Sequence, residues 1–215
     1  MSAVAVPDRA DEPPVTHTGG NEHYFSSTPG ARSRPSSVRL DLPDRSIDLT
    51  TDAGVFSPGR VDPGTKLLLQ ELPPIEHGPV LDLGCGYGPI ACTVALRHPE
   101  LEVVALDVNE RARGLCAQNA AMLGAHVRVL APDQAATLDT VATIVSNPPI
   151  RIGKPALHEL LSTWLDRLTP DGRAFLVVHK NLGSDSLARW LDERGHDVER
   201  LASRQGYRVL AITSR

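Results

Sequence analysis

A glycine-rich turn that follows an apolar strand could hold a nucleoside-like ligand. The segment reads Val80-Leu81-Asp82-Leu83-Gly84-Cys85-Gly86-Tyr87-Gly88-Pro89. In an open α/β sheet such a turn lies at the carboxyl edge, where ligands bind, and its glycines let a ligand approach the backbone. A dinucleotide-binding loop would place its third glycine at position 89, where this chain has proline. The spacing therefore argues against NAD and favours a single nucleoside without a pyrophosphate.

Carboxylates follow the two strands that come next. Asp107 ends the strand Val103–Leu106, where it could accept hydrogen bonds from both ribose hydroxyls of a bound nucleoside. Asp107 or Asn109 could instead cap the helix that starts near Glu110, and both roles can hold together. Asp133 is a candidate acceptor for the adenine amino group, or a turn residue.

Asn147-Pro148-Pro149-Ile150 is the most informative segment, because it ends another apolar strand at the same sheet edge. Two prolines fix two φ angles and remove two N–H donors, so we expect a rigid segment whose carbonyls have no competing donors. The Asn147 amide oxygen and the Pro148 carbonyl could then both accept from one planar amino group. Holding both hydrogens favours the geometry in which the nitrogen attacks an electrophile.

Only a sheet can bring these strand ends together. Apolar runs bounded by turn residues predict strands at 80–83, 103–106, 127–130, 141–146, 174–178, 198–202 and 207–213. Helices are predicted at 65–72, 89–97, 110–123, 156–168 and 184–194, with Thr169-Pro170-Asp171-Gly172 ending the fourth. This alternation predicts a Rossmann-like, mostly parallel α/β sheet with helices on both faces and an antiparallel end.

Three regions are predicted along the chain. Residues 1–22, rich in Pro, Gly, Thr and charge, should form a disordered tail. Residues 23–60 should form an arm and a β-hairpin that turns at Pro43-Asp44-Arg45-Ser46. In the arm, Tyr24 and Phe25 either pack on the domain or touch substrate. Residues 61–215 should form the α/β domain.

Composition and charge exclude several classes of protein. A net charge of −4 means that any nucleic-acid binding must rest on a local basic surface. No apolar run is long enough for a transmembrane helix, and the acidic, proline-containing start is unlike a secretory signal. Cys85, Cys92 and Cys116 form no CxxC pair. We therefore expect no disulfide framework, no metal site and a cytoplasmic location.

Taken together, these segments resemble the class I S-adenosylmethionine (SAM) dependent methyltransferases. Within that group the chain resembles the methyltransferase small domain family, which includes the 16S ribosomal RNA guanine-N2 methyltransferases. The resemblance runs from about Leu49 to Arg215. Besides the segments above, it is carried by Thr51-Asp52-Ala53-Gly54-Val55-Phe56-Ser57, Val61-Asp62-Pro63-Gly64-Thr65-Lys66, Arg151-Ile152-Gly153-Lys154 and Gly206-Tyr207-Arg208-Val209-Leu210.

The resemblance implies a seven-stranded sheet with an antiparallel last strand, and roles for individual residues. Asp82, Gly84 and Gly86 would line the methionine half of SAM, Asp107 would bind its ribose, and Phe56 and Thr65 would lie over the methionine end. The implied cofactor-binding set is Phe56, Thr65, Asp82, Gly84, Gly86, Gly88, Asp107, Val108, Asp133 and Asn147. The implied catalytic set is Asn147, Pro148, Pro149 and Ile150.

Two departures from the family pattern concern RNA recognition. The guanine-N2 enzymes carry an aromatic residue after Asn-Pro-Pro that can stack on a flipped base, whereas this chain has Ile150, as in single-domain relatives that read NPPIRxGK. Phe56, Tyr24 or Phe25 could supply a ring instead. The two-domain relatives also carry an extra N-terminal domain, where this chain has about 60 residues before the core.

The three lysines fall where the predicted sheet edge would bring them near the ligand. Lys66, Lys154 and Lys180 could join Arg151 and Arg60 in a phosphate-binding rim, or their placement could be chance. Arg151 and Lys154 are the predicted substrate-binding residues.

The expected reaction is methyl transfer from SAM to an exocyclic nucleobase amine, with guanine N2 of 16S ribosomal RNA as the preferred target. The partner would be ribosomal RNA or the small ribosomal subunit, the protein a monomer or homodimer, and no membrane would be involved. The alternatives are a protein glutamine amide, a small-molecule acceptor, and a SAM-binding module without catalysis.

Overall fold

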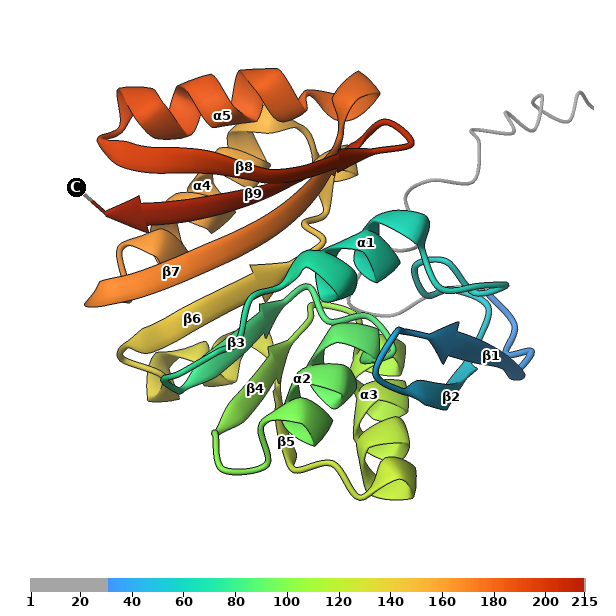
Figure 1. Cartoon of the computed structure of the whole chain (residues 1–215). Helices are drawn as coiled ribbons and strands as arrows, with labels where there is room; N and C mark the ends of the chain where they lie inside the picture. Colours follow the sequence, from blue (N-terminus) through green and yellow to red (C-terminus); the bar gives the residue numbers. More distant parts are fainter. Residues whose placement is uncertain (1–30, 215) are drawn as a thin grey trace, which may run out of the picture.

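A seven-stranded sheet forms the centre of the computed structural model, which describes residues 31–214 (Figure 1). Its strands lie in the order β5-β4-β3-β6-β7-β9-β8. They span Val80–Leu83 (β3), Val103–Leu106 (β4), Val127–Leu130 (β5), Val141–Ser146 (β6), Leu168–His179 (β7), His196–Arg204 (β8) and Tyr207–Ser214 (β9). All neighbours from β5 to β7 pair in parallel, and β9 runs antiparallel to both β7 and β8. The predicted fold class is confirmed.

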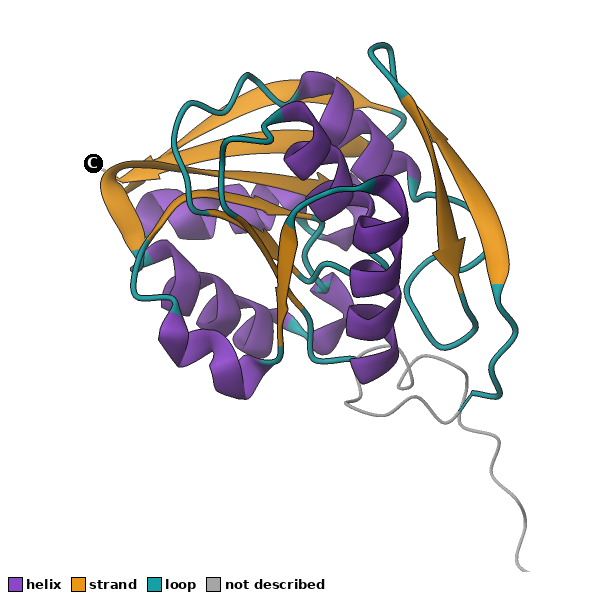
Figure 2. Ribbon diagram, turned by 90° about the horizontal axis from the view of Figure 1, so that it is seen from below, coloured by secondary structure: helices purple, strands orange, loops and turns teal. Residues whose placement is uncertain are grey.

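Helices cover both faces of the sheet (Figures 1 and 2). Helices α1 (Pro63–Glu71), α2 (Pro89–Arg97) and α3 (Glu110–Leu123) cover one face, and α4 (Lys154–Leu165) and α5 (Ser184–Glu193) cover the other. Three short 3-10 turns, η1 (Pro132–Thr137), η2 (Ile150–Ile152) and η3 (Lys180–Leu182), follow strands at the carboxyl edge. No helix within residues 31–214 is long and apolar enough to cross a membrane.

Strict alternation along the strands builds two apolar cores. In β4, Val103 and Ala105 pack with α1–α3, whereas Val104 and Leu106 pack with α4 and α5. The same alternation holds in β7 and β9, and all these side chains are buried. Strand segments that are buried on both faces are apolar at nearly every position, which is why these segments read as continuous apolar runs.

The predicted β-hairpin consists of β1 (Ser36–Asp41) and β2 (Ser46–Thr51) and packs beside α3 (Figure 2). Asn119 of α3 fixes it, because its side chain is fully buried and exchanges hydrogen bonds with both Thr50 N and Thr50 O at 2.8 Å. The same amide donates to Tyr87 O in the glycine loop at 2.8 Å. The hairpin is thereby tied to the ligand loop. The predicted tail, and Tyr24 and Phe25 of the predicted arm, lie outside the described residues.

The fourth helix ends earlier than predicted. Helix α4 stops at Leu165, and Leu168 already belongs to β7, as does the predicted turn at 169–172. The turn residues make a bulge: Leu168 pairs with Val141, but Arg173 pairs with Thr143. A Cβ at Gly172 would lie 2.9 Å from Thr169 O, so the bulge needs glycine. The turn chemistry was correctly recognised, but it bends a strand instead of ending a helix.

Candidate SAM and acceptor site

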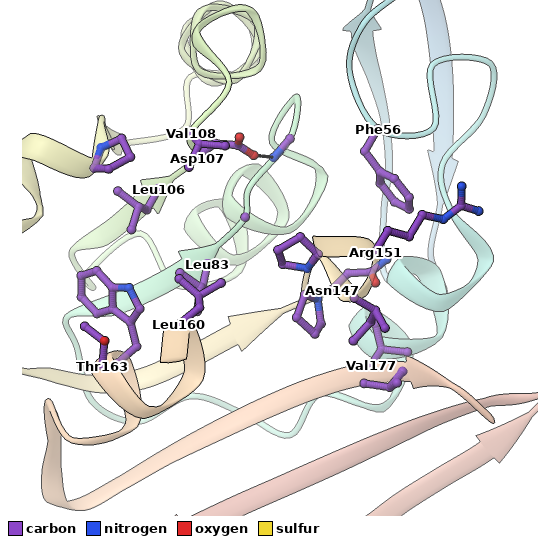
Figure 3. Close-up of a pocket in the computed structure, with 18 of the residues that line it drawn as sticks. Phe56, Leu83, Leu106, Asp107, Val108, Asn147, Arg151, Leu160, Thr163 and Val177 are labelled. Atoms are coloured by element: carbon purple, nitrogen blue, oxygen red, sulfur yellow. Dashed lines mark hydrogen bonds between the residues drawn. The ribbon is translucent and has the colours of Figure 1, made fainter. Parts of the chain in front are cut away.

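The carboxyl edge of the sheet opens into a cavity of about 540 Å³ (Figure 3). It extends from Val108 and Thr163 at one end to Asn147, Phe56 and Arg151 at the other. The cavity brings together most of the predicted site residues: Phe56, Gly84, Gly86, Asp107, Val108, Asp133, Asn147, Pro148, Pro149, Ile150 and Arg151. Thr65 lies beside it in a smaller pocket under the glycine loop, together with Phe56 and Asn147.

The glycine loop turns tightly between β3 and α2. Gly84 N and Cys85 N both donate to Leu106 O, at 2.8 and 3.0 Å. Gly86 has a positive φ, and a Cβ built there would meet nothing within 4 Å, so its backbone is open to a ligand. At Gly88, by contrast, a Cβ would lie 2.7 Å from Cys116 Sγ. Gly88 does not line the cavity, and its place in the structure is close packing of the loop against α3.

Asp107 and Asn109 take the two roles considered for the end of β4. Asn109 caps α3, because its Oδ1 accepts from Ala112 N at 3.1 Å. Asp107 instead faces the cavity and accepts from Gly86 N at 2.9 Å and from Asn109 N at 2.8 Å (Figure 3). Burial raises the pKa of its carboxyl, while the two backbone donors oppose that shift. Its carboxylate keeps lone pairs for a ribose, and ribose binding stays a prediction.

An apolar slot forms the end of the cavity beyond Asp107. Leu106 at the end of β4 and Val108 just after it line one side, and Leu160 of α4 lines the other (Figure 3). Trp164 of α4 also lines the cavity. Asp133 also lies there, on η1. In the sequence, Leu160 and Trp164 are recognisable only as part of the apolar face of the predicted helix at 156–168. Periodicity identifies such a face, but it cannot separate residues that fill the core from those that also wall a cavity.

Asn147 is held at the other end of the cavity by two acceptors. Its Nδ2 donates to Asp62 Oδ1 and to Thr65 Oγ1, each at 2.9 Å. Its Oδ1 accepts no hydrogen bond from any side chain or backbone group within residues 31–214. Because the amide is planar, fixing Nδ2 also fixes the direction of Oδ1. The predicted acceptor is therefore available and oriented.

Asp62 is a polar site residue that is not predicted from the sequence. Its Oδ1 caps α1 by accepting from Gly64 N at 2.9 Å and Thr65 N at 3.1 Å, besides holding Asn147. Its Oδ2 accepts from the Tyr207 hydroxyl at 3.3 Å. The sequence offered one signal, since Asp before Pro and Gly is a typical helix start. Nothing in the spacing connects position 62 with position 147.

The Asn-Pro-Pro segment differs from its prediction in one respect. The expectation that its carbonyls have no competing donors is wrong, because Ile150 N donates to Pro148 O at 2.8 Å and Ile152 N to Pro149 O at 3.1 Å. These bonds arise because the chain turns at once into η2. A carbonyl oxygen has two lone pairs, so Pro148 O can still accept a second hydrogen.

The predicted basic rim divides into separate places. Arg151 lines the cavity, whereas Lys154 Nζ donates to Ser186 Oγ at 3.2 Å on the outer side of α4 and α5. Lys66 lines a different cavity, described below. Arg151, Lys154 and Lys66 therefore do not form a single rim. Among the described residues, no cluster of His, Cys, Asp or Glu side chains could hold a metal ion.

Asp82 is buried beneath the glycine loop and does not line the cavity. Its side chain is 1% exposed, and its Oδ2 accepts from Ala91 N at 2.9 Å. Its Oδ1 is buried and accepts no hydrogen bond from the residues that the structure describes. Burial raises the pKa of this carboxyl from 3.8 to about 8. Contact between Asp82 and the methionine half of SAM therefore stays a prediction.

The Asp82 carboxyl should make stability depend on pH. Between pH 4 and pH 8 the unfolded chain ionises this group while the folded protein keeps it protonated, so stability falls as the pH rises. The slope from this group alone is about 1.4 kcal/mol per pH unit. We expect Asp82→Asn to remove that component in urea unfolding between pH 5 and pH 8. Parallel pH profiles for the two proteins would contradict this assignment.

Comparison with known proteins places the chain in a family. Residues 46–211 match the family described as methyltransferase small domain. An uncharacterised Bacillus subtilis protein, YbxB, is 34% identical over 88% of this chain and 97% of its own length. Ribosomal RNA small subunit methyltransferase C of Shewanella amazonensis is 33% identical over 88% of this chain but 56% of its own length.

The solved structures agree with this placement. The Thermus thermophilus 16S rRNA N2 G1207 methyltransferase, solved with AdoMet and guanosine, matches with a TM-score of 0.74 and 25% identity. The match covers 86% of this chain and 52% of that protein. The chain thus spans about half the length of the ribosomal RNA enzymes that it matches. Together with the sequence match, this similarity confirms the resemblance predicted from the sequence: the chain belongs to the methyltransferase small domain family.

Proposed function

We propose that this enzyme methylates the exocyclic N2 amine of a guanine in small-subunit ribosomal RNA. That it is a SAM-dependent methyltransferase follows from its family; the acceptor is our proposal. The observation that carries the proposal is the fixed Asn147 amide, whose Oδ1 is oriented as a hydrogen-bond acceptor at the end of the cavity. The relatives named as ribosomal RNA methyltransferases support the choice of guanine and of RNA.

The cavity has the donor and acceptor groups that SAM needs. The open backbone of Gly84 and Gly86 would accept the methionine portion, and Asp107 would accept from the ribose hydroxyls. The apolar slot between Val108 and Trp164 would take the adenine, with Asp133 as acceptor for its amino group. When bound, SAM supplies the electrophilic methyl group.

The acceptor amine would be held by oxygen atoms alone. Asn147 Oδ1 and the second lone pair of Pro148 O would each accept one N–H of the amine. These dipoles stabilise the positive charge that develops on nitrogen as it is methylated, and positioning supplies much of the remaining rate. A methylated amine loses its extra proton readily, so no strong general base is needed.

Phe56 would supply the aromatic ring that Ile150 does not provide. Its side chain is 45% exposed, lines the cavity and lies at the same end as Asn147 and Arg151 (Figure 3). Its loop is held on α3, since Asn109 Nδ2 donates to Gly54 O at 2.8 Å. A large apolar side chain held in an exposed position could stack on an extruded base.

The decisive experiment is methyl transfer from labelled SAM to small ribosomal subunits and to naked 16S RNA, both from a strain that lacks this gene. Parallel reactions contain total protein or small metabolites. Label that digests to N2-methylguanosine supports the proposal. Demonstrable SAM binding with label only in protein or in metabolites would overturn the proposed acceptor and favour a glutamine amide or a small molecule.

Arg151 and Lys154 should contribute to RNA binding through phosphate charge. Replacing both with glutamine should weaken RNA binding and reduce the slope of log affinity against log salt. Each contact to a single-stranded phosphate contributes about 0.7 to that slope, so the loss should be about 1.4. RNA binding by fluorescence anisotropy between 50 and 300 mM salt tests this. An unchanged slope would mean that these two cations do not bind phosphate.

A further inference from the structure

A second cavity of about 270 Å³ lies on the other side of Tyr207 from the acceptor end of the main cavity. We propose that it binds the phosphate of a nucleotide next to the methylated one, an inference that rests on the proposed RNA substrate. Helix α1 provides Lys66 and Gln70 on one wall, and the β8–β9 hairpin provides Arg204 and Gln205 on the other. Two cations with two amides match a phosphodiester and its sugar.

Lys66 is the more available of the two cations. It is half-buried at the cavity wall, and its Nζ makes no hydrogen bond or salt bridge with any group within residues 31–214, although it interacts electrostatically with the Asp41 carboxylate. Arg204 is paired with Glu71 at 3.7 Å, and both side chains are accessible to solvent. Glu71 offsets part of the charge of Arg204 and holds it beside α1. The two cations that line the cavity, Lys66 and Arg204, are thus only partly offset by Glu71 and Asp41, which do not line it.

In the hairpin turn between β8 and β9, Gln205 adopts a positive φ that is unfavourable for its side chain. Gln205 and Gly206 form a two-residue turn with φ values of 50° and 84°. Such turns favour Asn-Gly or Asp-Gly, because a longer side chain is disfavoured at positive φ. Backbone strain of this kind is commonly retained where the side chain has a task. Here that side chain lines the cavity.

The turn is also fixed relative to the catalytic end. Lys180 N donates to Gly206 O at 2.7 Å, and a Cβ at Gly206 would lie 2.6 Å from His179 Nε2. Tyr207 stacks edge-on against His179, and its hydroxyl donates to Asp62 Oδ2 at 3.3 Å. The Tyr207 side chain thus lies between the acceptor end of the main cavity and the second cavity. An RNA strand that places its base beside Asn147 would pass its backbone over Tyr207.

The test uses the full chain and a short single-stranded oligoribonucleotide that contains one guanosine. Lys66→Gln and Arg204→Gln should each weaken binding about tenfold and lower the salt slope by roughly 0.7. Arg128→Gln is the matched control, since Arg128 is an exposed cation paired with Glu102 at 3.1 Å on the opposite edge strand β5. Replacing the phosphate on either side of the guanosine with a neutral methylphosphonate should weaken binding to the wild type. It should cost less with Lys66→Gln, because that contact is already lost.

The outcomes separate this inference from the proposed function. Wild-type protein that binds the strand with a Lys66-dependent salt slope, but does not methylate RNA, supports the phosphate site and overturns the proposed acceptor. Methylated RNA with equal affinity and slope for Lys66→Gln, Arg204→Gln and Arg128→Gln overturns the phosphate site and leaves the acceptor standing. A wild type that binds no RNA overturns the inference directly.

Discussion

Asn147→Ala should lower kcat for methyl transfer by about 10²–10³-fold, the usual effect of removing one preorganised dipole from a transition state. The amide oxygen is the only side-chain acceptor that Asn147 offers to the amine, and its direction is fixed by Asp62 and Thr65. Alanine leaves neither the acceptor nor a donor for those partners. Single-turnover transfer from labelled SAM to the accepted RNA measures the loss.

The matched control for this variant is Asn181→Ala. Asn181 follows β7 at the same sheet edge, in η3, and is exposed. We expect SAM affinity to stay within about threefold for both variants, because the proposed ribose and adenine contacts come from the residues that follow β4 and from α4. A kcat for Asn147→Ala within threefold of wild type would remove Asn147 from the reacting centre. Equal losses for the two variants would indicate damage to the sheet edge as a whole.

Much of the fold could be predicted from local sequence. The central strands β3, β4 and β6 are buried on both faces, so each reads as a mainly apolar run. Gly124 and Gly195 end their helical segments in left-handed conformations. The error at residues 166–172 has a clear cause. Thr-Pro-Asp-Gly is turn chemistry in any context, and only the pairing of Leu168 with Val141 shows that the strand has already begun.

The candidate site could be predicted only where a motif lies at the end of a strand. Gly84, Asp107 and Asn147 are recognisable because the carboxyl ends of parallel strands meet at one edge. Asp62 lies at a helix start and accepts from Asn147, and Tyr207 lies on an antiparallel strand and donates to Asp62, although all three are far apart in the chain. A sequence carries no sign of such a contact. The role of Trp164 in the cavity wall could not be predicted either, because it depends on the packing of α4 against the sheet.

The Asp62 carboxylate should matter to catalysis through Asn147 and not only through the helix that it caps. Asp62→Ser should lower kcat by about 10²-fold, because an acceptor displaced by about 1 Å costs that much. Serine is as good an N-cap as aspartate, so α1 should remain folded. Its shorter side chain cannot reach both the helix and Asn147 Nδ2, which leaves the amide held by Thr65 alone.

Asp62→Asn provides the comparison that isolates this role. Its side-chain oxygen can still accept from Thr65 N and from Asn147 Nδ2, so most of kcat should be retained. Thermal unfolding midpoints for the two variants should agree, because both keep the cap. If both variants lose kcat equally, the negative charge of Asp62 is what matters and not its geometry. If both keep wild-type kcat, Thr65 alone holds the amide, and the contact between Asp62 and Asn147 is incidental.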